Sequence, residues 1–286
     1  MISISQVSIN KTFDQVSNKQ RIVELFRRLN DGGTKLSSFD LVASILKGFS
    51  WEMEGFLEKM LDEYKDIGLS QDNLIKLIFL LQDDHKKEMA SIEAKDAEFA
   101  ITNKERINFT LKNVKDFLIH AKLYDYYRDG NRSFIPLFII AYHLFHKEIE
   151  TGPLAVYFDN FDAGNIDFPI MYEWIYHSLL NGVFRSRGAG WVAYKTGVRK
   201  LLAEIKKHKK NDFLKQELFN VYVEHPVVFT QSYDAENLDN LDRPFLYYLM
   251  YDRNQTIRSQ DIDHIMPRSI LANLKYGWDD INSIKN

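Results

Sequence analysis

The sequence Phe134-Ile-Pro-Leu-Phe-Ile-Ile-Ala-Tyr-His-Leu-Phe-His-Lys147 contains the most apolar run of this 286-residue chain. The run itself, residues 134–145, is too short to cross a bilayer, because a membrane-spanning helix needs about 20 apolar residues. Proline is tolerated in the first turn of a helix, so Pro136 fits a helix that begins at residue 135. The stretch therefore predicts a buried helix over residues 135–147 of a globular protein.

Apolar residues recur at helical spacing through most of the remaining chain. A helix at residues 20–29 is followed by the polar, glycine-containing residues 30–34, and a second helix runs through residues 41–46. Further helices are predicted at residues 53–66, 71–81, 103–122, 171–180, 197–210 and 241–254. Residues 91–100 fit either a loop or a short helix. We therefore predict a mainly α-helical, multi-helix body over residues 1–254.

The composition supports a folded, globular protein. Hydrophobic residues make up 45% of the chain and aromatic residues 14%, which is enough apolar material for a core. The formal net charge is -3, so contacts with DNA would have to come from local basic patches. The absence of cysteine excludes disulfide scaffolds, cysteine nucleophiles and thiolate zinc sites. Residues 1–15 lack the apolar core of a signal peptide, so we expect a cytoplasmic protein without a membrane partner.

Two basic segments stand out without matching a known binding loop. Residues 206–212, Lys-Lys-His-Lys-Lys-Asn-Asp, close the helix predicted at residues 197–210, and such a run is usually a solvated helix end. Residues 182–190, Gly-Val-Phe-Arg-Ser-Arg-Gly-Ala-Gly, look flexible, and Arg185 and Arg187 could approach a phosphate. They lack the Gly-x-x-x-x-Gly-Lys-Ser/Thr spacing of a phosphate-binding loop.

Histidines and tyrosines in the helical region are predicted to pack in the core or at its rim. His143 and His146 share a helix face, but neither Glu148 nor Glu150 is placed to complete a metal site. The tyrosines of residues 124–127 and 247–248 could stack on nucleic-acid bases, although packing is favoured at this helical spacing.

The residues that carry chemistry are found near the end of the chain, at Asp261-Ile-Asp-His-Ile-Met-Pro-Arg-Ser269. A neutral imidazole such as that of His264 can accept a proton from water near pH 7. The carboxylate of Asp263 is a hard oxygen ligand that suits Mg²⁺. The pair therefore suits metal-assisted hydrolysis of a phosphodiester, whereas a hydrogen-bonded pair on a surface loop is the structural alternative.

This stretch resembles the first strand of an HNH (ββα-metal) nuclease, and the following residues 279–286 resemble the asparagine-containing segment of that family. The resemblance implies that His264 is the general base and that Asp263 binds Mg²⁺ or Mn²⁺. It implies that Asn286 braces the histidine loop, with Asn282 as the other candidate. The family's second metal ligand would lie on a helix beyond Asn286. We therefore expect residues 255–286 to be the start of an HNH nuclease domain, truncated in this chain, with an incomplete metal site.

Residues 21–46 resemble the N-terminal domain family of GmrSD-type restriction proteins, which are modification-dependent (type IV) endonucleases. The matching positions are Phe26, Asn30, Gly32, Gly33, Leu36 and Ser37. Asn30, Gly32 and Gly33 would form the family's turn, although a glycine-terminated helix is a sufficient structural explanation. The ParB-like start of that domain, with its Asp-Gly-Gln-Gln-Arg type motif, has no counterpart here, so whether the chain binds a nucleotide stays open.

Taken together, the two resemblances imply a fragment of an HNH DNA endonuclease that defends bacteria against phage. Its partner would be DNA, including DNA with modified cytosine, and its reaction would be phosphodiester cleavage. A non-catalytic helical regulatory or interaction module with a degenerate HNH remnant is the main alternative. A domain that binds modified DNA without cutting it is a third possibility.

Overall fold

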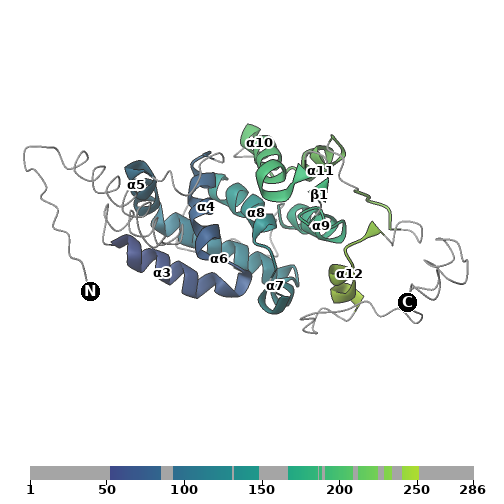
Figure 1. Ribbon diagram of the computed structural model, residues 1–286, viewed down its shortest axis with the longest axis horizontal. Coiled ribbons are helices and arrows are strands. Elements are labelled where there is room, and N and C mark those ends of the chain that lie inside the picture. The colour runs from purple at the N-terminus through teal and green to yellow at the C-terminus, as the bar shows by residue number, and fades with distance from the viewer. Residues whose placement is uncertain are drawn as a thin grey trace, which may run out of the picture.

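The computed structural model describes residues 52–84, 93–130, 132–147, 167–185, 187–188, 191–208, 212–224, 229–233 and 240–250. Most of these residues are helical (Figure 1). The elements are α3 (Glu52–Tyr64), the 3₁₀-helix η1 (Lys65–Ile67), α4 (Gln71–Leu81), α5 (Ala94–Thr102), α6 (Lys104–His120), α7 (Tyr124–Gly130), α8 (Ile135–His146), α9 (Asp167–Leu180), β1 (Arg187–Gly188), β2 (Trp191–Val192), the π-helix η4 (Ala193–Val198), α10 (Arg199–Lys207), α11 (Lys215–Glu224) and α12 (Arg243–Met250). The predicted mainly α-helical class is confirmed for this part of the chain.

Helix α8 lies in the middle of the molecule, as Figure 1 shows. It packs against α4, α6, η4 and α10. All ten residues from Pro136 to Phe145 are buried, and the proline occupies the first turn. Burial on every side explains why this helix carries apolar residues all round instead of a single stripe. The buried helix predicted from the sequence is confirmed, with its last residue one position earlier than expected.

Local signals fix the ends of α4 and α5. The Ser70 side chain accepts a hydrogen bond from the Asn73 amide at 3.2 Å, which caps the start of α4. Before it, Gly68 adopts φ +82°, and a Cβ at this position would lie 2.9 Å from the Arg132 carbonyl oxygen. At α5, the Glu93 amide donates to Asp96 at 2.7 Å in a capping box. The open choice at residues 91–100 is therefore resolved as a helix over 94–102.

An aromatic cluster joins α7, α9 and α12. The Tyr126 ring lies 5.0 Å from Phe245 and 5.0 Å from Tyr248, and Phe245 also contacts Tyr176. Two hydroxyls of this cluster reach the turn after α6: Tyr176 donates to the Ala121 carbonyl at 2.7 Å, and Tyr248 donates to the Lys122 carbonyl at 2.6 Å. The tyrosines at 126–127 and 248 thus pack in the core, as predicted.

A tight hairpin and a π-helix lead into α10. Strands β1 and β2 pair antiparallel, with Gly188 opposite Trp191. The Trp191 side chain is fully buried, and its indole N–H donates to the Val183 carbonyl at 3.0 Å. Gly197 of η4 lies against this ring, because a Cβ there would be 2.7 Å from Trp191 Cζ2. The buried Trp191 directly follows residues 182–190, the segment predicted to be flexible, and α10 begins two residues later than predicted.

Several sequence predictions differ from the structure or cannot be compared with it. Helices α7 and α11 form although none was predicted at these positions, and α9 begins four residues before the predicted 171. The helices predicted at residues 20–29 and 41–46, residues 251–254 and the C-terminal HNH element lie outside the described residues. Among the helices that the structure describes, no segment is long and apolar enough to span a membrane.

Candidate functional site

The catalytic and turn residues predicted from the sequence all lie outside the described ranges. These residues are Asn30, Gly32, Gly33, Asp263, His264, Asn282 and Asn286. Their mutual geometry is therefore still a prediction. Within the ranges described above, no group of three or more His, Asp or Glu side chains could hold a metal ion.

A buried charged cluster connects the end of α8 to the start of α9 and to the residues just before α11. Asp167 is the first residue of α9, and its Oδ2 atom lies 3.1 Å from His143 Nε2 and accepts a hydrogen bond from Lys147 Nζ. Its Oδ1 atom accepts from the Phe213 amide at 2.9 Å. The side chains of His143 and Asp167 are 1% and 0% exposed. The cluster, which we call the Asp167 cluster, ties three elements together away from solvent.

The surroundings of Asp167 keep its carboxylate ionised. Burial by itself raises the pKa of this group. The hydrogen bond and charge interaction with His143, together with hydrogen bonds from Lys147 and the Phe213 amide, outweigh burial and hold the pKa well below its usual value. Lys147 also contacts Asp212, with Nζ 3.2 Å from Oδ1. The cluster is sealed against a substrate, so its chemistry is that of a structural brace, and the core role predicted for His143 is confirmed.

A second polar group lies nearer the surface on α9. The His177 ring stacks on Tyr233, with centroids 5.3 Å apart, and Nδ1 is hydrogen-bonded to the tyrosine hydroxyl. Glu173 lies one turn earlier and pairs with Lys215 at 2.5 Å. Burial lowers the pKa of His177, and the opposing effect of Glu173 is smaller. The lowered pKa favours the neutral imidazole. The contacts of this ring belong to the packing between α9, α11 and residues 229–233.

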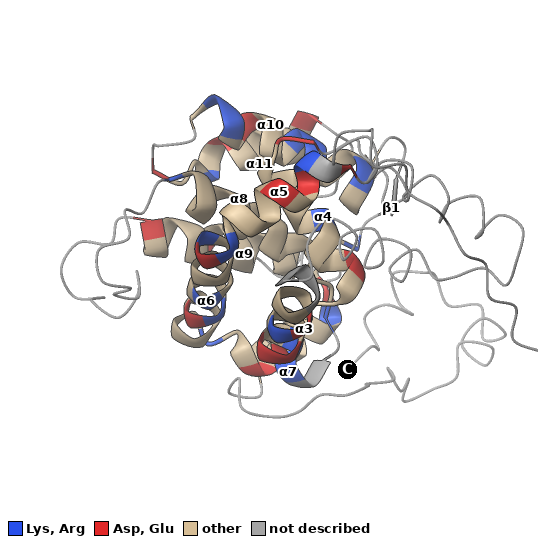
Figure 2. Cartoon of the chain, turned by 90° about the vertical axis from the view of Figure 1, so that its left-hand side faces the viewer, with Lys and Arg blue, Asp and Glu red and all other residues tan. Residues whose placement is uncertain are grey.

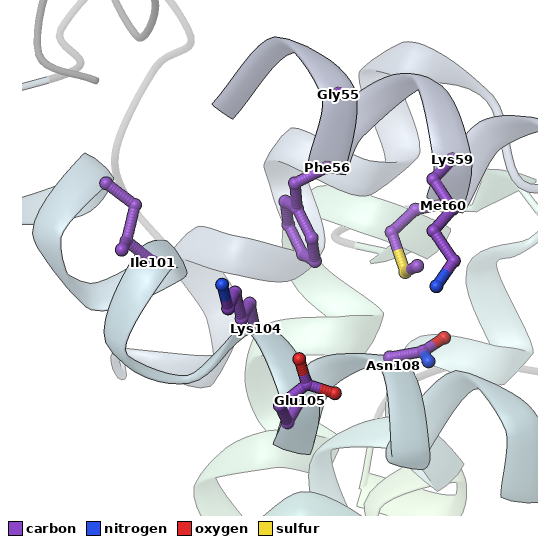
Figure 3. Close-up of a pocket in the computed structure, with 8 residues that line it drawn as sticks. All are labelled: Gly55, Phe56, Lys59, Met60, Ile101, Lys104, Glu105 and Asn108. Atoms are coloured by element: carbon purple, nitrogen blue, oxygen red, sulfur yellow. The ribbon is translucent and has the colours of Figure 1, made fainter. Parts of the chain in front are cut away.

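A cavity of about 230 Å³ lies between α3 and α6 (Figure 3). Its lining residues are Gly55, Phe56, Lys59, Met60, Ile101, Lys104, Glu105 and Asn108. Figure 3 shows Phe56 and Met60 of α3 pointing toward α6, with Glu105 and Asn108 facing them. Asn108 Oδ1 accepts from the Tyr64 hydroxyl at 2.8 Å, which orients that amide. The cavity is below the roughly 300 Å³ of ordinary ligand pockets and mixes both charges, so it indicates no particular ligand.

Helix α10 presents a basic face to solvent. Its buried side consists of Leu201, Leu202 and Ile205, whereas Lys200, Lys206 and Lys207 are exposed. Figure 2 shows blue bands on α10 at the top of the view, with red beside them. A hollow of about 310 Å³ adjoins this face, lined by Leu80, Asp83, Tyr142, Leu202, Ala203, Lys206 and Lys207. We call the exposed lysines of α10, with Lys195 of η4, the α10 basic face.

Local sequence patterns predict only part of these features. The partners of the Asp167 cluster come from residues 143–147, 167 and 212–213, so nothing in the local pattern shows that they meet. The α10 basic face did have a signal, because apolar positions 201, 202 and 205 leave the basic residues on the opposite side.

No protein-family model matches the chain, and no curated protein matches it. The functional conclusion therefore rests on the chain's own residues.

Proposed function

We propose that this chain is part of a bacterial DNA restriction protein of the GmrSD type, which cleaves phosphodiester bonds of foreign DNA in the cytoplasm. The observation that carries the proposal is the stretch Asp261–Ser269 with its aspartate–histidine pair, followed by Asn282 and Asn286. The order of the two resemblances along the chain supports it: residues 21–46 match the N-terminal domain family, and the nuclease pattern follows after a helical region.

In this proposal His264 removes a proton from the attacking water molecule. Its imidazole suits this task because its ordinary pKa is near the working pH. Asp263 contributes a hard carboxylate oxygen, which is the ligand type that Mg²⁺ or Mn²⁺ prefers. When bound, the ion would stabilise negative charge on the phosphate. Asn286 or Asn282 would brace the loop that orients His264.

The helical body would hold the nuclease segment and the DNA relative to each other. Its central helix α8 is buried on all sides, and the Asp167 cluster ties α8 to α9 and α11. Such a body is suited to a scaffold or to the transmission of a binding event.

A cleavage assay with the complete polypeptide encoded by the gene tests the proposal. We expect Mg²⁺- or Mn²⁺-dependent nicking of DNA that contains modified cytosine, abolished by chelator and by His264→Ala. The matched control is His120→Ala, because His120 is an exposed histidine on α6. Cleavage that survives His264→Ala, or no cleavage with any of these metals and DNAs, would refute the nuclease assignment.

The second candidate function is a helical module that binds DNA without cutting it. The α10 basic face favours this candidate, because it offers cations to solvent on the helical body itself. It predicts salt-dependent binding to DNA that is unaffected by His264→Ala, with no metal-dependent cleavage.

A further inference from the structure

A strong imbalance of charge in the sequence is centred on the residues of η4 and α10. Residues 185–210 contain nine lysines and arginines and one acidic residue, Glu204, in a chain whose net charge is -3. The rest of the chain is therefore clearly acidic. A protein of this kind would be repelled by nucleic acid on most of its surface and attracted at this segment.

Helix geometry directs this charge outward. Leu201, Leu202 and Ile205 are 0–4% exposed and hold α10 on the core. With about 100° between successive residues, Lys200 and Lys207 share the opposite side, and Lys206 lies at its edge. Lys195 is exposed on the preceding η4. From Lys200 to Lys207 the rise along the helix is about 10 Å, which matches several phosphate charges at about one per 1.7 Å of duplex.

Acidic neighbours neutralise only part of the α10 basic face. Lys207 pairs with Glu204 at 2.7 Å, and Lys206 lies 3.3 Å from Asp83, which also accepts a hydrogen bond from Tyr142. Lys195 and Lys200 form no ion pair with any residue that the structure describes. Within the part of the chain that the structure describes, no carboxylate neutralises these two charges.

The burial pattern distinguishes a nucleic acid from a membrane as that partner. An amphipathic helix that binds a lipid surface inserts its apolar side into the lipid. In α10 that side is already buried in the core, so the exposed residues of the helix are Lys200, Ala203, Lys206 and Lys207, with Arg199 and Glu204 partly exposed. A helix that exposes cations and no large apolar side chain suits the phosphates of a duplex, which are bound by charge and without reading the bases.

We propose that the α10 basic face, formed by Lys195, Lys200, Lys206 and Lys207, binds the sugar–phosphate backbone of duplex DNA. This inference names a DNA contact for the proposed restriction function and rests on that function for the choice of DNA. It places substrate binding on the helical body, separate from the cleavage residues Asp263 and His264.

The test is a salt titration of DNA affinity with the whole chain. A fluorescent duplex is titrated in chelator, so that cleavage plays no part, and log K is plotted against log salt concentration. The variant Lys195→Ala/Lys200→Ala removes two cations whose loss leaves no described carboxylate unpaired. Each lost phosphate contact should reduce the slope by about 0.9, so the slope should fall by about 2 and low-salt affinity by at least about tenfold.

The matched control is Lys59→Ala/Lys104→Ala, which makes the same charge change at the cavity between α3 and α6. We expect wild-type affinity and slope for it. Equal weakening by both double variants would overturn the proposal, because net charge alone would then explain binding. Stronger binding to duplex RNA or to phosphatidylserine vesicles than to duplex DNA would overturn the choice of DNA.

The experiment also separates this inference from the nuclease proposal. Binding that depends on Lys195 and Lys200 in a protein that never cleaves would support the α10 basic face and refute the nuclease. Cleavage that depends on His264, with DNA binding unchanged in the lysine variant, would support the nuclease and refute the α10 basic face.

Discussion

At the scale of single residues, Asp167 is the position where a small change should have the largest effect. Its ionised carboxylate accepts from His143, Lys147 and the Phe213 amide while fully buried. Replacing it with asparagine keeps the shape and removes the charge, which leaves the Lys147 ammonium and the buried N–H groups of His143 and Phe213 with a weaker acceptor. We expect Asp167→Asn to lower the free energy of unfolding by about 3 kcal/mol.

Denaturant unfolding measures that loss, and Asp212→Asn is the control. The Asp212 side chain is 55% exposed and contacts the same Lys147, so its loss should change stability by less than about 0.5 kcal/mol. Equal effects of the two substitutions would contradict the view that burial of Asp167 decides its importance.

His177 gives a separate prediction on pH. Burial lowers the pKa of His177 below its ordinary value, so the unfolded chain takes up a proton more readily than the folded one. The sign follows from linkage: the contribution to stability is complete above the unfolded pKa of about 6.5 and is lost as the pH falls through the lowered folded pKa. Melting temperatures at about pH 7.5 and about pH 5.5 should therefore differ more in wild type than in His177→Gln. An identical drop in both proteins would exclude His177 as a source of the pH dependence.

Sequence patterns identified buried single residues better than their partners. The helical run predicted His143 to be a core histidine, and it is. Its partner Asp167 is 24 residues away in sequence. Helical periodicity reports which face of a helix is buried, but it does not report which distant residue meets that face.

At the scale of elements, two glycines make a matched pair. A Cβ at Gly197 in η4 would meet Trp191 Cζ2 at 2.7 Å, whereas a Cβ at Gly55 in α3 would meet nothing within 4 Å. Gly197→Ala should therefore lower stability by about 1–3 kcal/mol through overpacking against a buried ring. Gly55→Ala should raise it by about 0.5–1 kcal/mol, because alanine is the better helix former. Thermal unfolding of both variants checks the pair, and a stabilising Gly197→Ala would contradict the packing of η4 on Trp191.

Helices with strong local sequence signals were predicted correctly, and helices without them were not. Helix α4 was predicted with its observed ends because Ser70 caps it and an apolar run fills it. Helix α7 has only seven residues, Tyr-Asp-Tyr-Tyr-Arg-Asp-Gly, and depends on the packing of Tyr126 against α12. Helix α11 lacks a similar start signal and is held through Phe219 and Tyr222, which are buried in the described core. Tertiary contacts, which no local pattern contains, determine these two helices.

At the scale of the whole molecule, the mainly α-helical class followed from periodicity, and it is confirmed for the described residues. The proposed nuclease residues came from a resemblance of short motifs, which specifies residue types but not their distances. The α10 basic face could be predicted from the sequence in part. Sequence showed the lysines, but the structure was needed to show that α10 rests on the core with its charged side outward.

The division of the chain near residue 254 leads to a prediction about folding. The described core extends from Leu57 to Tyr248, and the residues after 254, Gln-Thr-Ile-Arg-Ser-Gln, are mostly polar. A chain of residues 1–254 should therefore unfold cooperatively within about 2 °C of the longer chain. It should bind DNA with the same salt dependence and show no metal-dependent cleavage, because Asp263 and His264 are removed.

A slightly shorter chain, residues 1–240, is the decisive comparison. It also loses α12, whose Phe245 and Tyr248 are 0% and 3% exposed and cover Tyr126 and Tyr176. Exposing that cluster should reduce stability by more than about 4 kcal/mol. If the 1–254 chain were destabilised as much as the 1–240 chain, residues after 254 would contribute to the same core. The nuclease segment and the helical body would then be one folding unit, and α10 and His264 could not be treated as separate binding and cleavage sites.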